Sequence, residues 1–427
     1  MVESTDVVIV GAGPYGLSLS AHLRARGVRL RTFGLPMKFW RDMPVGVNLK
    51  SPAFGTSVSV PERGHSFDAW CRQHNLEDFE PCTMQTFATY GEDLQKRFVP
   101  QVEEVLVTNV AKIADGFEVT LANGARVRAR QVVVATGLSY LATDADVLRG
   151  LPPSLTRHTA DIADYSEFRN KTVAVIGGGA SAVEAGALVL EAGGTAEVLA
   201  RGPKLTIYGR TARYRPFWQR IKAPWTALGP DRRCWLMVHI PLFVHFLPAA
   251  QRIKMAREAF GPASPWWIDD RVRGKVPMHS KSQVEDARAV GNRVQLKVRD
   301  AAGVVREMEV DSVISGTGYV WDVARLPFLD RDLRQSIDLI ERAPKLDVNF
   351  ETSVKGLYFI GPISTLSFGP LMRFVVGADF TARSLTRHLA DRRAPVTTRA
   401  SRYLTTVFVA AWEKVQSHKA ARAQTRA

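Results

Sequence analysis

The chain has 427 residues, about three times a typical domain of ~100–150 residues, so two or more domains are expected. Apolar residues make up 46% and charged residues 23%, which excludes global disorder, a collagen-like repeat and a disulfide-rich scaffold. The net charge of +15 attracts polyanions such as anionic lipid or a phosphate-bearing cofactor, but no nucleic-acid-binding module is present.

The sequence predicts no leader and no membrane-spanning segment. Residues 1–6 lead straight into a strand, without the basic and apolar regions of a signal peptide. The longest apolar run, near 235–250, is shorter than ~20 residues and contains histidines and prolines. We therefore expect a cytoplasmic protein.

Residues 5–34 have the pattern of a strand, a glycine-rich turn, a helix and a second strand. The first strand is Asp6–Val10, the helix is Leu17–Arg26 and the second strand is Val28–Phe33. A unit of this kind is typical of dinucleotide-binding domains.

The turn of this unit carries the fingerprint GxGxxG. Gly11 permits a tight turn, Gly13 lets a pyrophosphate approach the backbone, and Gly16 lets the helix pack on the strand. The pyrophosphate then binds the N–H groups at the start of the helix, where Pro14 and Tyr15 lie. We infer a dinucleotide site here.

The acidic residue that usually binds the adenosine ribose is missing from this site. It should follow the second strand, about 20 residues on. The chain has Gly34 at that place. We expect ribose contacts from the backbone or from other side chains, such as Lys38 or Arg41.

A second unit at Lys171–Arg201 repeats the pattern. Its strands are Thr172–Ile176 and Ala196–Ala200, and its helix is Val183–Ala192. The turn and helix start form a second fingerprint, in which alanine at the third key position is within the allowed pattern. Its residues are Gly177, Gly178, Gly179, Ala180, Ser181 and Ala182.

Arg201 and Lys204 follow the last strand of the second unit, where an acidic residue would select NADH. Cations at this place suit the 2′-phosphate of NADPH, although two solvated surface cations are the alternative. Since flavin accepts hydride from nicotinamide, the economical pairing is FAD in the first site and NADPH in the second.

Two pairs of alternating segments predict antiparallel hairpins. The first is Val110–Thr120 with Arg126–Val134, and the second is Arg293–Val298 with Val304–Val310. A further short strand is expected at Leu357–Ile360.

The second unit is inserted into the first domain. We predict an α/β fold with two Rossmann-like dinucleotide-binding domains and small antiparallel hairpins. The FAD domain comprises 1–165 and 311–427, with a long helix at Phe374–Asp391. The NADPH domain comprises 166–310 and includes an aromatic and basic insertion at 203–282.

The destination of the electrons decides the reaction. A disulfide reductase needs a close redox pair, but Cys71, Cys82 and Cys234 have no such spacing. The sequence also has no metal, haem or iron–sulfur ligand pattern. Oxygen is the acceptor that remains.

The chain resembles the class B flavin-dependent monooxygenases: flavin-containing monooxygenases, Baeyer–Villiger enzymes and lysine or ornithine N-hydroxylases. The resemblance covers nearly the whole chain and rests on Gly11–Gly16, Trp40-Arg41-Asp42, Ala135-Thr136-Gly137, Gly177–Ala182 and Gly316-Thr317-Gly318-Tyr319. It implies that NADPH reduces FAD and that oxygen forms a C4a-(hydro)peroxyflavin, which gives one oxygen atom to a small organic substrate.

Two other functions stay open beside this resemblance. The first is an NAD(P)H oxidase or flavin-linked reductase without oxygen transfer, and the second is a non-enzymatic flavin redox sensor. The insertion at 203–282 either sets substrate selectivity, forms a satellite core or subunit contact in a homo-oligomer, or touches a membrane surface.

The chain departs from the family pattern at two places. Of the motif FxGxxxH only His158-Thr159 matches, so His158 is either a functional hinge or an ordinary histidine. Gly361-Pro362 stands where the family has Gly-Asp near the flavin. Arg373 then either compensates by a phosphate or flavin contact or forms a plain salt bridge.

No catalytic residue is assigned, and the candidates are His158 and Trp40. Trp40 either lines the flavin or packs in the core. The other expected cofactor contacts are Val110, Ala135, Thr136, Gly137, Gly318 and Gly361.

Overall fold

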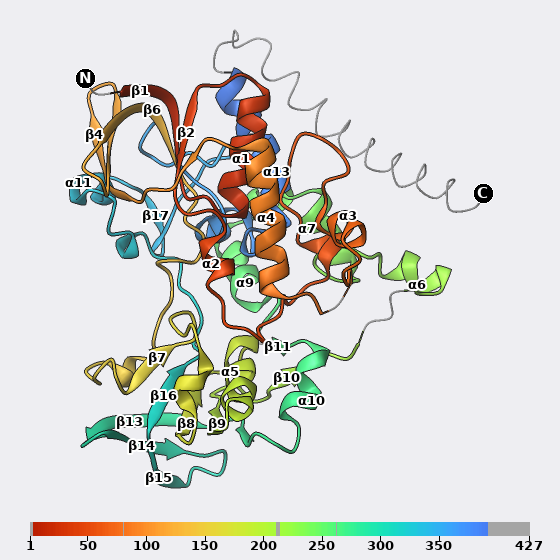
Figure 1. Ribbon diagram of the computed structural model, residues 1–427, viewed down its shortest axis with the longest axis vertical. Coiled ribbons are helices and arrows are strands. Elements are labelled where there is room, and N and C mark those ends of the chain that lie inside the picture. The colour runs from red at the N-terminus through yellow and green to blue at the C-terminus, as the bar shows by residue number, and fades with distance from the viewer. Residues whose placement is uncertain (1–2, 80, 211–213, 262, 392–427) are drawn as a thin grey trace.

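The computed structural model describes residues 3–79, 81–210, 214–261 and 263–391. The small basic tail that follows Trp412 in the sequence lies outside these residues. Figure 1 shows a sheet with covering helices in the upper half of the view, a second sheet in the lower half, and connecting segments between them.

The first sheet has seven strands in the order β3-β2-β1-β6-β5-β4, with β19 also paired to β6. Its strands β1, β2, β3, β6 and β19 run parallel, and β4 and β5 are antiparallel additions. The strands are β1 (Glu3–Val10), β2 (Leu30–Phe33), β3 (Val102–Glu103), β4 (Val107–Ile113), β5 (Gly116–Leu121), β6 (Arg126–Val134) and β19 (Leu357–Phe359). Val8 and Ile9 of β1 are fully buried, as expected for a parallel strand covered on both faces.

Helices pack against this sheet and against one another. α1 (Pro14–Ala25) contacts α13 (Gly377–Asp391) and α4 (Met84–Phe98), and α2 (Lys38–Arg41) also lies on α4. The long helix that was expected at 374–391 is α13, which begins three residues later, at Gly377. The shorter helices of this domain are α3 (Phe67–Gln73), α11 (Arg331–Gln335) and α12 (Thr365–Phe368).

The first hairpin differs in detail from the prediction. The segment expected as one strand at 110–120 is two strands, because the chain turns between β4 and β5 at residues 114–115. A turn at Asn123-Gly124 joins β5 to β6, with Gly124 at φ 82°.

The second sheet has the order β12-β9-β8-β16-β7 and is entirely parallel. Its strands are β7 (Thr156–His158), β8 (Thr172–Ile176), β9 (Thr195–Leu199), β12 (Met278–His279) and β16 (Ser312–Ser315), and α5 (Ala180–Glu191) packs on β8 and β9. β7 and β16 lie in this sheet, although the predicted boundaries assigned 156–158 and 312–315 to the first domain. The reason is that β16 pairs with β8 on one side and β7 on the other.

An antiparallel sheet of three strands follows the second parallel sheet. It consists of β13 (Gln283–Val290), β14 (Arg293–Arg299) and β15 (Val305–Val310). The predicted hairpin corresponds to β14 and β15, and β13 is an additional strand that the sequence pattern did not indicate. Two-stranded pairs elsewhere are β10 (Thr206–Ile207) with β11 (Ala263–Ser264) and β17 (Leu339–Ile340) with β18 (Ala343–Pro344).

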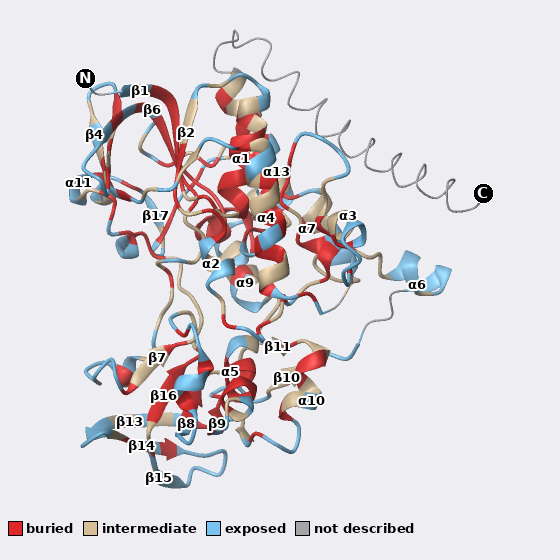
Figure 2. Ribbon diagram, viewed as in Figure 1, coloured by how far each residue is buried: buried red, intermediate tan, exposed pale blue. Residues whose placement is uncertain are grey.

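The insertion at 203–282 contains short helices joined by irregular segments and reaches both domains. Its helices are α6 (Phe217–Lys222), α7 (Arg232–His239), α8 (Leu242–His245), α9 (Ala249–Glu258) and α10 (Asp269–Val272). α8 and α9 contact α12 of the first domain, whereas α10 contacts α5 of the second. α6 projects away from the rest of the fold and is exposed (Figure 2). None of the described helices is long and apolar enough to cross a membrane.

Candidate functional site

The first fingerprint forms a tight cradle at the carboxyl end of β1. Gly11 has φ +118°, and a Cβ there would lie 2.4 Å from the carbonyl oxygen of Ala135. A Cβ on Gly16 would lie 1.9 Å from the carbonyl oxygen of Gly11. Both glycines are therefore required by the protein itself, because α1, β1 and the segment after β6 meet here without room for a side chain.

Gly13 has a different role from its two neighbours. A Cβ on Gly13 would have no protein atom within 4 Å, so open space lies over the start of α1. Gly13 is the N-cap of α1, no side chain caps the helix, and no acidic residue lies in its first turn. The uncapped N–H groups and the open space fit the diphosphate of a dinucleotide such as FAD.

Gly34 explains the missing ribose acid in steric terms. It has φ +138°, and a Cβ on it would lie 3.0 Å from the backbone nitrogen of Ala12 and 3.3 Å from the Cα of Gly11. An aspartate or glutamate at this position would be strained and would press on the fingerprint turn. The chain therefore keeps glycine at the position where an acid was expected.

Tyr15 connects the fingerprint to a distant segment of the chain. Its hydroxyl donates a hydrogen bond shared by the carbonyls of Met372 (3.0 Å) and Phe374 (2.8 Å). Burial raises the pKa of Tyr15 well above its usual value, so the hydroxyl stays protonated. Gly361, at φ +79°, lies against the Tyr15 ring, which would be 3.4 Å from a Cβ on Gly361. The structure thus brings together Gly361 and Tyr15, two of the residues predicted to contact the cofactor.

The residues of the Trp40 segment are engaged with the protein. The Trp40 ring packs edge-on against Phe87 of α4, with 4.9 Å between ring centroids. Lys38 pairs with Asp42, and Arg41 lies 3.4 Å from Glu92. Lys38 and Arg41 thus neutralise nearby acids, and core packing accounts for the placement of Trp40.

Val110 and Arg373 also have protein partners. Val110 is fully buried, its N–H donates to the carbonyl of Phe328 (2.7 Å), and its carbonyl accepts from Asp330 N (3.0 Å). Arg373 donates to the carbonyls of Ala256 (3.4 Å) and Ala259 (3.1 Å) at the end of α9. Neither backbone group of Val110 is left for a nucleotide, and Arg373 caps a helix of the insertion.

The second fingerprint reproduces the geometry of the first. Gly177 has φ +150°, and a Cβ on it would lie 2.3 Å from the carbonyl oxygen of Gly316. A Cβ on Gly316 would lie 2.6 Å from that of Ala182, which is fully buried. Gly179 is the N-cap of α5, no side chain caps this helix, and no acid lies in its first turn. The residues that follow it, Ala180 and Ser181, are accessible at the helix start. This cradle fits a second dinucleotide diphosphate.

Arg201 and Lys204 come directly after β9 and are exposed. Neither forms an ion pair with another residue that the structure describes. Two cations without acidic partners at the end of this strand fit the 2′-phosphate of NADPH.

The two cradles face one junction because the chain crosses between the sheets at their carboxyl ends. Ala135, Thr136 and Gly137 leave β6, and Gly316–Gly318 leave β16. The crossovers pair with each other, since Thr143 N donates to the carbonyl of Gly318 (3.0 Å). Ligands of parallel α/β sheets bind at such carboxyl edges.

His158 lies at the end of β7, beside this junction. It is 3% exposed, and its Nδ1 accepts a hydrogen bond from Ala160 N (3.0 Å). Its buried Nε2 makes no hydrogen bond within the described chain, and its ring lies edge-on to Tyr319 at 5.7 Å. Burial lowers the pKa of His158, so the ring is neutral at physiological pH.

An ion pair joins the two domains beside the junction. Lys50 pairs with Glu184 of α5, whose side chain is 5% exposed. The backbone N–H of Asn48 donates to the same carboxylate (3.2 Å), and Arg271 lies 3.9 Å from it. The sequence motifs did not single out Glu184, and only its place two residues after the second fingerprint could have indicated a role.

All three cysteines are free and buried. Burial raises the pKa of Cys71 and of Cys234 to about 11, so both stay as thiols. Cys82 donates weakly to the carbonyl of Glu77 (3.4 Å). The protein therefore has no redox disulfide to accept electrons.

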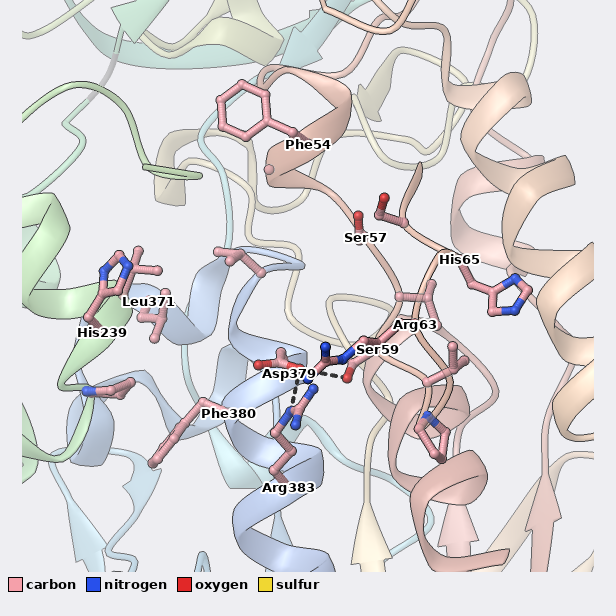
Figure 3. Close-up of a pocket in the computed structure, with 18 of the residues that line it drawn as sticks. Phe54, Ser57, Ser59, Arg63, His65, His239, Leu371, Asp379, Phe380 and Arg383 are labelled. Atoms are coloured by element: carbon pink, nitrogen blue, oxygen red, sulfur yellow. Dashed lines mark hydrogen bonds and ion pairs between the residues drawn. The ribbon is translucent and has the colours of Figure 1, made fainter. Parts of the chain in front are cut away.

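A cavity of about 820 Å³ lies beside α13, away from both fingerprints (Figure 3). Its walls come from residues 54–66, residues 238–242 and residues 371–387, and no fingerprint residue lines it. The sequence pattern did not indicate this cavity, because its walls come from three segments that are distant along the chain.

Comparisons with known proteins agree with this geometry. Residues 8–217 match the family model described as pyridine nucleotide-disulphide oxidoreductase. The chain is 26% identical over 277 residues to the FAD-dependent urate hydroxylase of Xanthomonas campestris pv. campestris. The aligned region covers 61% of this chain and 54% of that protein. The chain thus spans about half the length of this relative.

Two solved structures share the fold of nearly the whole chain. The ornithine hydroxylase of Pseudomonas aeruginosa has a TM-score of 0.73 and 18% identity, covering 92% of this chain and 100% of that one. The ornithine N-hydroxylase of Kutzneria sp. 744, solved with reduced FAD, NADP⁺ and L-ornithine, has a TM-score of 0.71, 18% identity and the same coverage. The chain therefore shares its fold with these two ornithine hydroxylases, which confirms the α/β fold class with two Rossmann-like domains that the sequence predicts.

Proposed function

We propose that the protein is an NADPH-dependent FAD monooxygenase that transfers one oxygen atom of O₂ to a small organic substrate. One observation carries the proposal: two uncapped glycine cradles open at the carboxyl ends of the parallel strands of two sheets. A reductase that passes electrons to a disulfide is disfavoured, because the three cysteines are buried and free.

Each cradle has a defined task in this proposal. The open N–H groups around Gly13 hold the FAD diphosphate, and those around Gly179 hold the NADPH diphosphate. Arg201 and Lys204 bind the 2′-phosphate. Bound FAD supplies the transfer of electrons from nicotinamide to oxygen.

The chain itself orients the two dinucleotides and excludes water. Tyr15 fixes the segment 372–374 against the first cradle, and Gly361 lies close against the Tyr15 ring. His158 is neutral, and its ring lies edge-on to Tyr319, which follows Gly318 in the crossover from β16. This contact supports a positioning role rather than proton transfer. No acid or base among the described residues is assigned to the chemistry.

The experiment is a balance of NADPH, oxygen and peroxide with the FAD-loaded protein. Primary amines are the first substrates to screen, since the similar structures are ornithine hydroxylases, followed by sulfides and ketones. We expect one substrate to lower the peroxide yield in proportion to the oxygenated product formed. Full conversion of consumed oxygen to peroxide with every substrate would indicate the alternative, an NAD(P)H oxidase or reductase.

We further propose that the protein works in the cytoplasm, at an anionic membrane surface that the insertion contacts. Residues 201–230 contain seven Lys or Arg and no Asp or Glu. Tyr214, Phe217, Trp218 and Ile221 are 86%, 64%, 71% and 48% exposed on and beside the projecting α6. Exposed aromatic residues among cations are typical of segments that lie in a membrane interface. The buried free cysteines suit a reducing compartment.

A further inference from the structure

The cavity beside α13 is a feature of the molecule that the two cradles do not use. Its volume of about 820 Å³ is within the range of small-molecule sites. Leu371 and Val376 line it, whereas the carbonyls of Met372 and Phe374, in the same segment, accept from Tyr15. The cavity is thus separated from the first cradle by one segment of chain.

Most of the cavity wall is apolar. Phe54, Ile240, Leu242 and Phe380 contribute side chains from all three wall segments, and Ile240 is 41% exposed at the surface. Figure 3 shows Arg63, Asp379 and Arg383 gathered at the middle of the cavity, with Phe54, Leu371 and Phe380 around them. A ligand here meets apolar surface over most of its body and charge at one place.

The charge at that place is positive. Asp379 accepts hydrogen bonds from Ser59 Oγ (2.8 Å) and Arg383 Nε (2.8 Å), so its carboxylate is already neutralised. The other acid of the wall, Glu62, lies 3.3 Å from Arg97 outside the cavity. Arg63 is exposed and forms no ion pair with another residue that the structure describes.

The floor beneath this charge is rigid. Ser59 is 8% exposed, and its Oγ lies 3.0 Å from Nε2 of His22 while its N–H donates to Ser18 Oγ (2.9 Å). α1 and α13 are thereby tied to the loop at 54–66. A preformed floor lowers the ordering cost of binding.

We propose that this cavity binds an amphipathic monoanion, an aliphatic or aromatic carboxylate, with its carboxylate on Arg63 and its apolar body against Ile240, Leu242 and Phe380. The guanidinium of Arg63 matches a carboxylate in charge and geometry. The walls offer no unpaired acid that would attract an amine or other cation. The site goes beyond the proposed oxygenation, because binding here requires neither NADPH nor turnover.

The test is calorimetric titration of the FAD-loaded full chain with decanoate below its micelle concentration. Decanol and decyltrimethylammonium are the neutral and cationic controls. We expect saturable decanoate binding, weakened about tenfold to a hundredfold by Arg63→Gln, since charge-assisted hydrogen bonds are strong. The Arg149→Gln variant, which removes an exposed arginine whose partner Asp146 also lies outside the cavity wall, is expected to bind decanoate like the wild type.

Val238→Trp, which fills the cavity from α7, tests the location independently and is expected to abolish binding of decanoate. Equal affinity of the wild type for decanoate and decyltrimethylammonium, or unchanged decanoate affinity in both Arg63→Gln and Val238→Trp, would overturn the proposal. NADPH oxidation by these same variants is measured in parallel. Its loss together with intact decanoate binding would count against the oxygenase and not against this site.

Discussion

Lys50 and Glu184 form an ion pair across the junction of the two domains. Lys50 lies between the first fingerprint and α3, and Glu184 lies one turn into α5, directly behind the second fingerprint. The pair therefore ties the start of one dinucleotide-binding helix to a loop of the other domain. The Lys50 side chain is 31% exposed and that of Glu184 5%, so the carboxylate is the desolvated partner.

Glu184→Gln is expected to lower the free energy of unfolding by about 2 kcal/mol, because it leaves Lys50 and Arg271 without their buried counter-charge. Chemical denaturation measures the change. Glu191→Gln is the matched control, since Glu191 also pairs with Arg271 but is 46% exposed, and should cost less than about 1 kcal/mol. Equal losses in the two variants would contradict a special role for Glu184.

Gly13→Ala should separate cofactor binding from folding. Its φ is −87° and a Cβ there meets no protein atom, so the apoprotein should lose less than about 1 kcal/mol of stability. FAD affinity, followed by absorbance and fluorescence, should fall at least tenfold because the methyl group occupies the diphosphate space. Gly11→Ala should instead destabilise the apoprotein as well, since its Cβ meets Ala135. Wild-type FAD affinity in Gly13→Ala would refute the placement of the diphosphate.

Replacing Arg201 and Lys204 together by glutamine should raise the KM for NADPH about tenfold to a hundredfold and leave the KM for NADH nearly unchanged. The physical reason is the loss of both cations that face the 2′-phosphate. Steady-state kinetics with the two coenzymes measures the ratio. Arg306→Gln is the control, because Arg306 lies in the same domain but pairs with Glu197 (2.6 Å).

The stability of the protein should fall in mild acid partly because of His22. Burial and the nearby Arg383 lower the pKa of His22 from 6.5 to about 4. The folded state thus favours the neutral ring, so this contribution is fully present above pH 6.5 and is lost as the pH falls toward 4. His22→Gln should remove about 2 kcal/mol of this pH dependence, after allowance for the partial exposure of the ring. Melting temperatures between pH 7 and pH 4 provide the measurement, with His74→Gln as the exposed control.

Phe217→Ser with Trp218→Ser should weaken binding to vesicles that contain anionic lipid, because these side chains supply the exposed apolar surface of α6. Co-sedimentation with neutral and with anionic vesicles measures the effect, and added salt should weaken the binding further. Val304→Ser is the matched control, since Val304 is 61% exposed in the second domain, far from the cationic segment. Equal binding to neutral and anionic vesicles, together with unchanged binding of the doubly substituted variant, would contradict the membrane contact.

Both strand–turn–helix units were predictable because their information is local. The strand at Thr172–Ile176 agrees residue for residue, and the glycines of both turns are required by contacts that any such unit makes. The predicted boundary between the domains at residue 165 lies about ten residues too late, because β7 already belongs to the second sheet. β7 is three residues long and is held in its sheet by pairing with β16, more than 150 residues away, and no local pattern reports such pairing.

Other parts of the site could not be predicted from the sequence. Arg373 has the pattern of a phosphate ligand, but the end of α9 lies beside it and takes up its guanidinium. The position of α9 depends on packing of the insertion against α12. Gly34 stands where dinucleotide-binding domains usually have an acidic residue. The reason is visible only in three dimensions, because a Cβ on Gly34 would lie 3.0 Å from the backbone nitrogen of Ala12.

The second domain enters and leaves the first at a single place. Thr159 N, just after its first strand, donates to the carbonyl of Ser315, the last residue of β16, at 3.0 Å. Removal of the residues between them would leave two ends already adjacent, which a short linker can join at little entropic cost. The path of the first sheet would stay intact, but a replacement would also have to supply the surfaces of α8 and α9, which pack on α12 of the first domain.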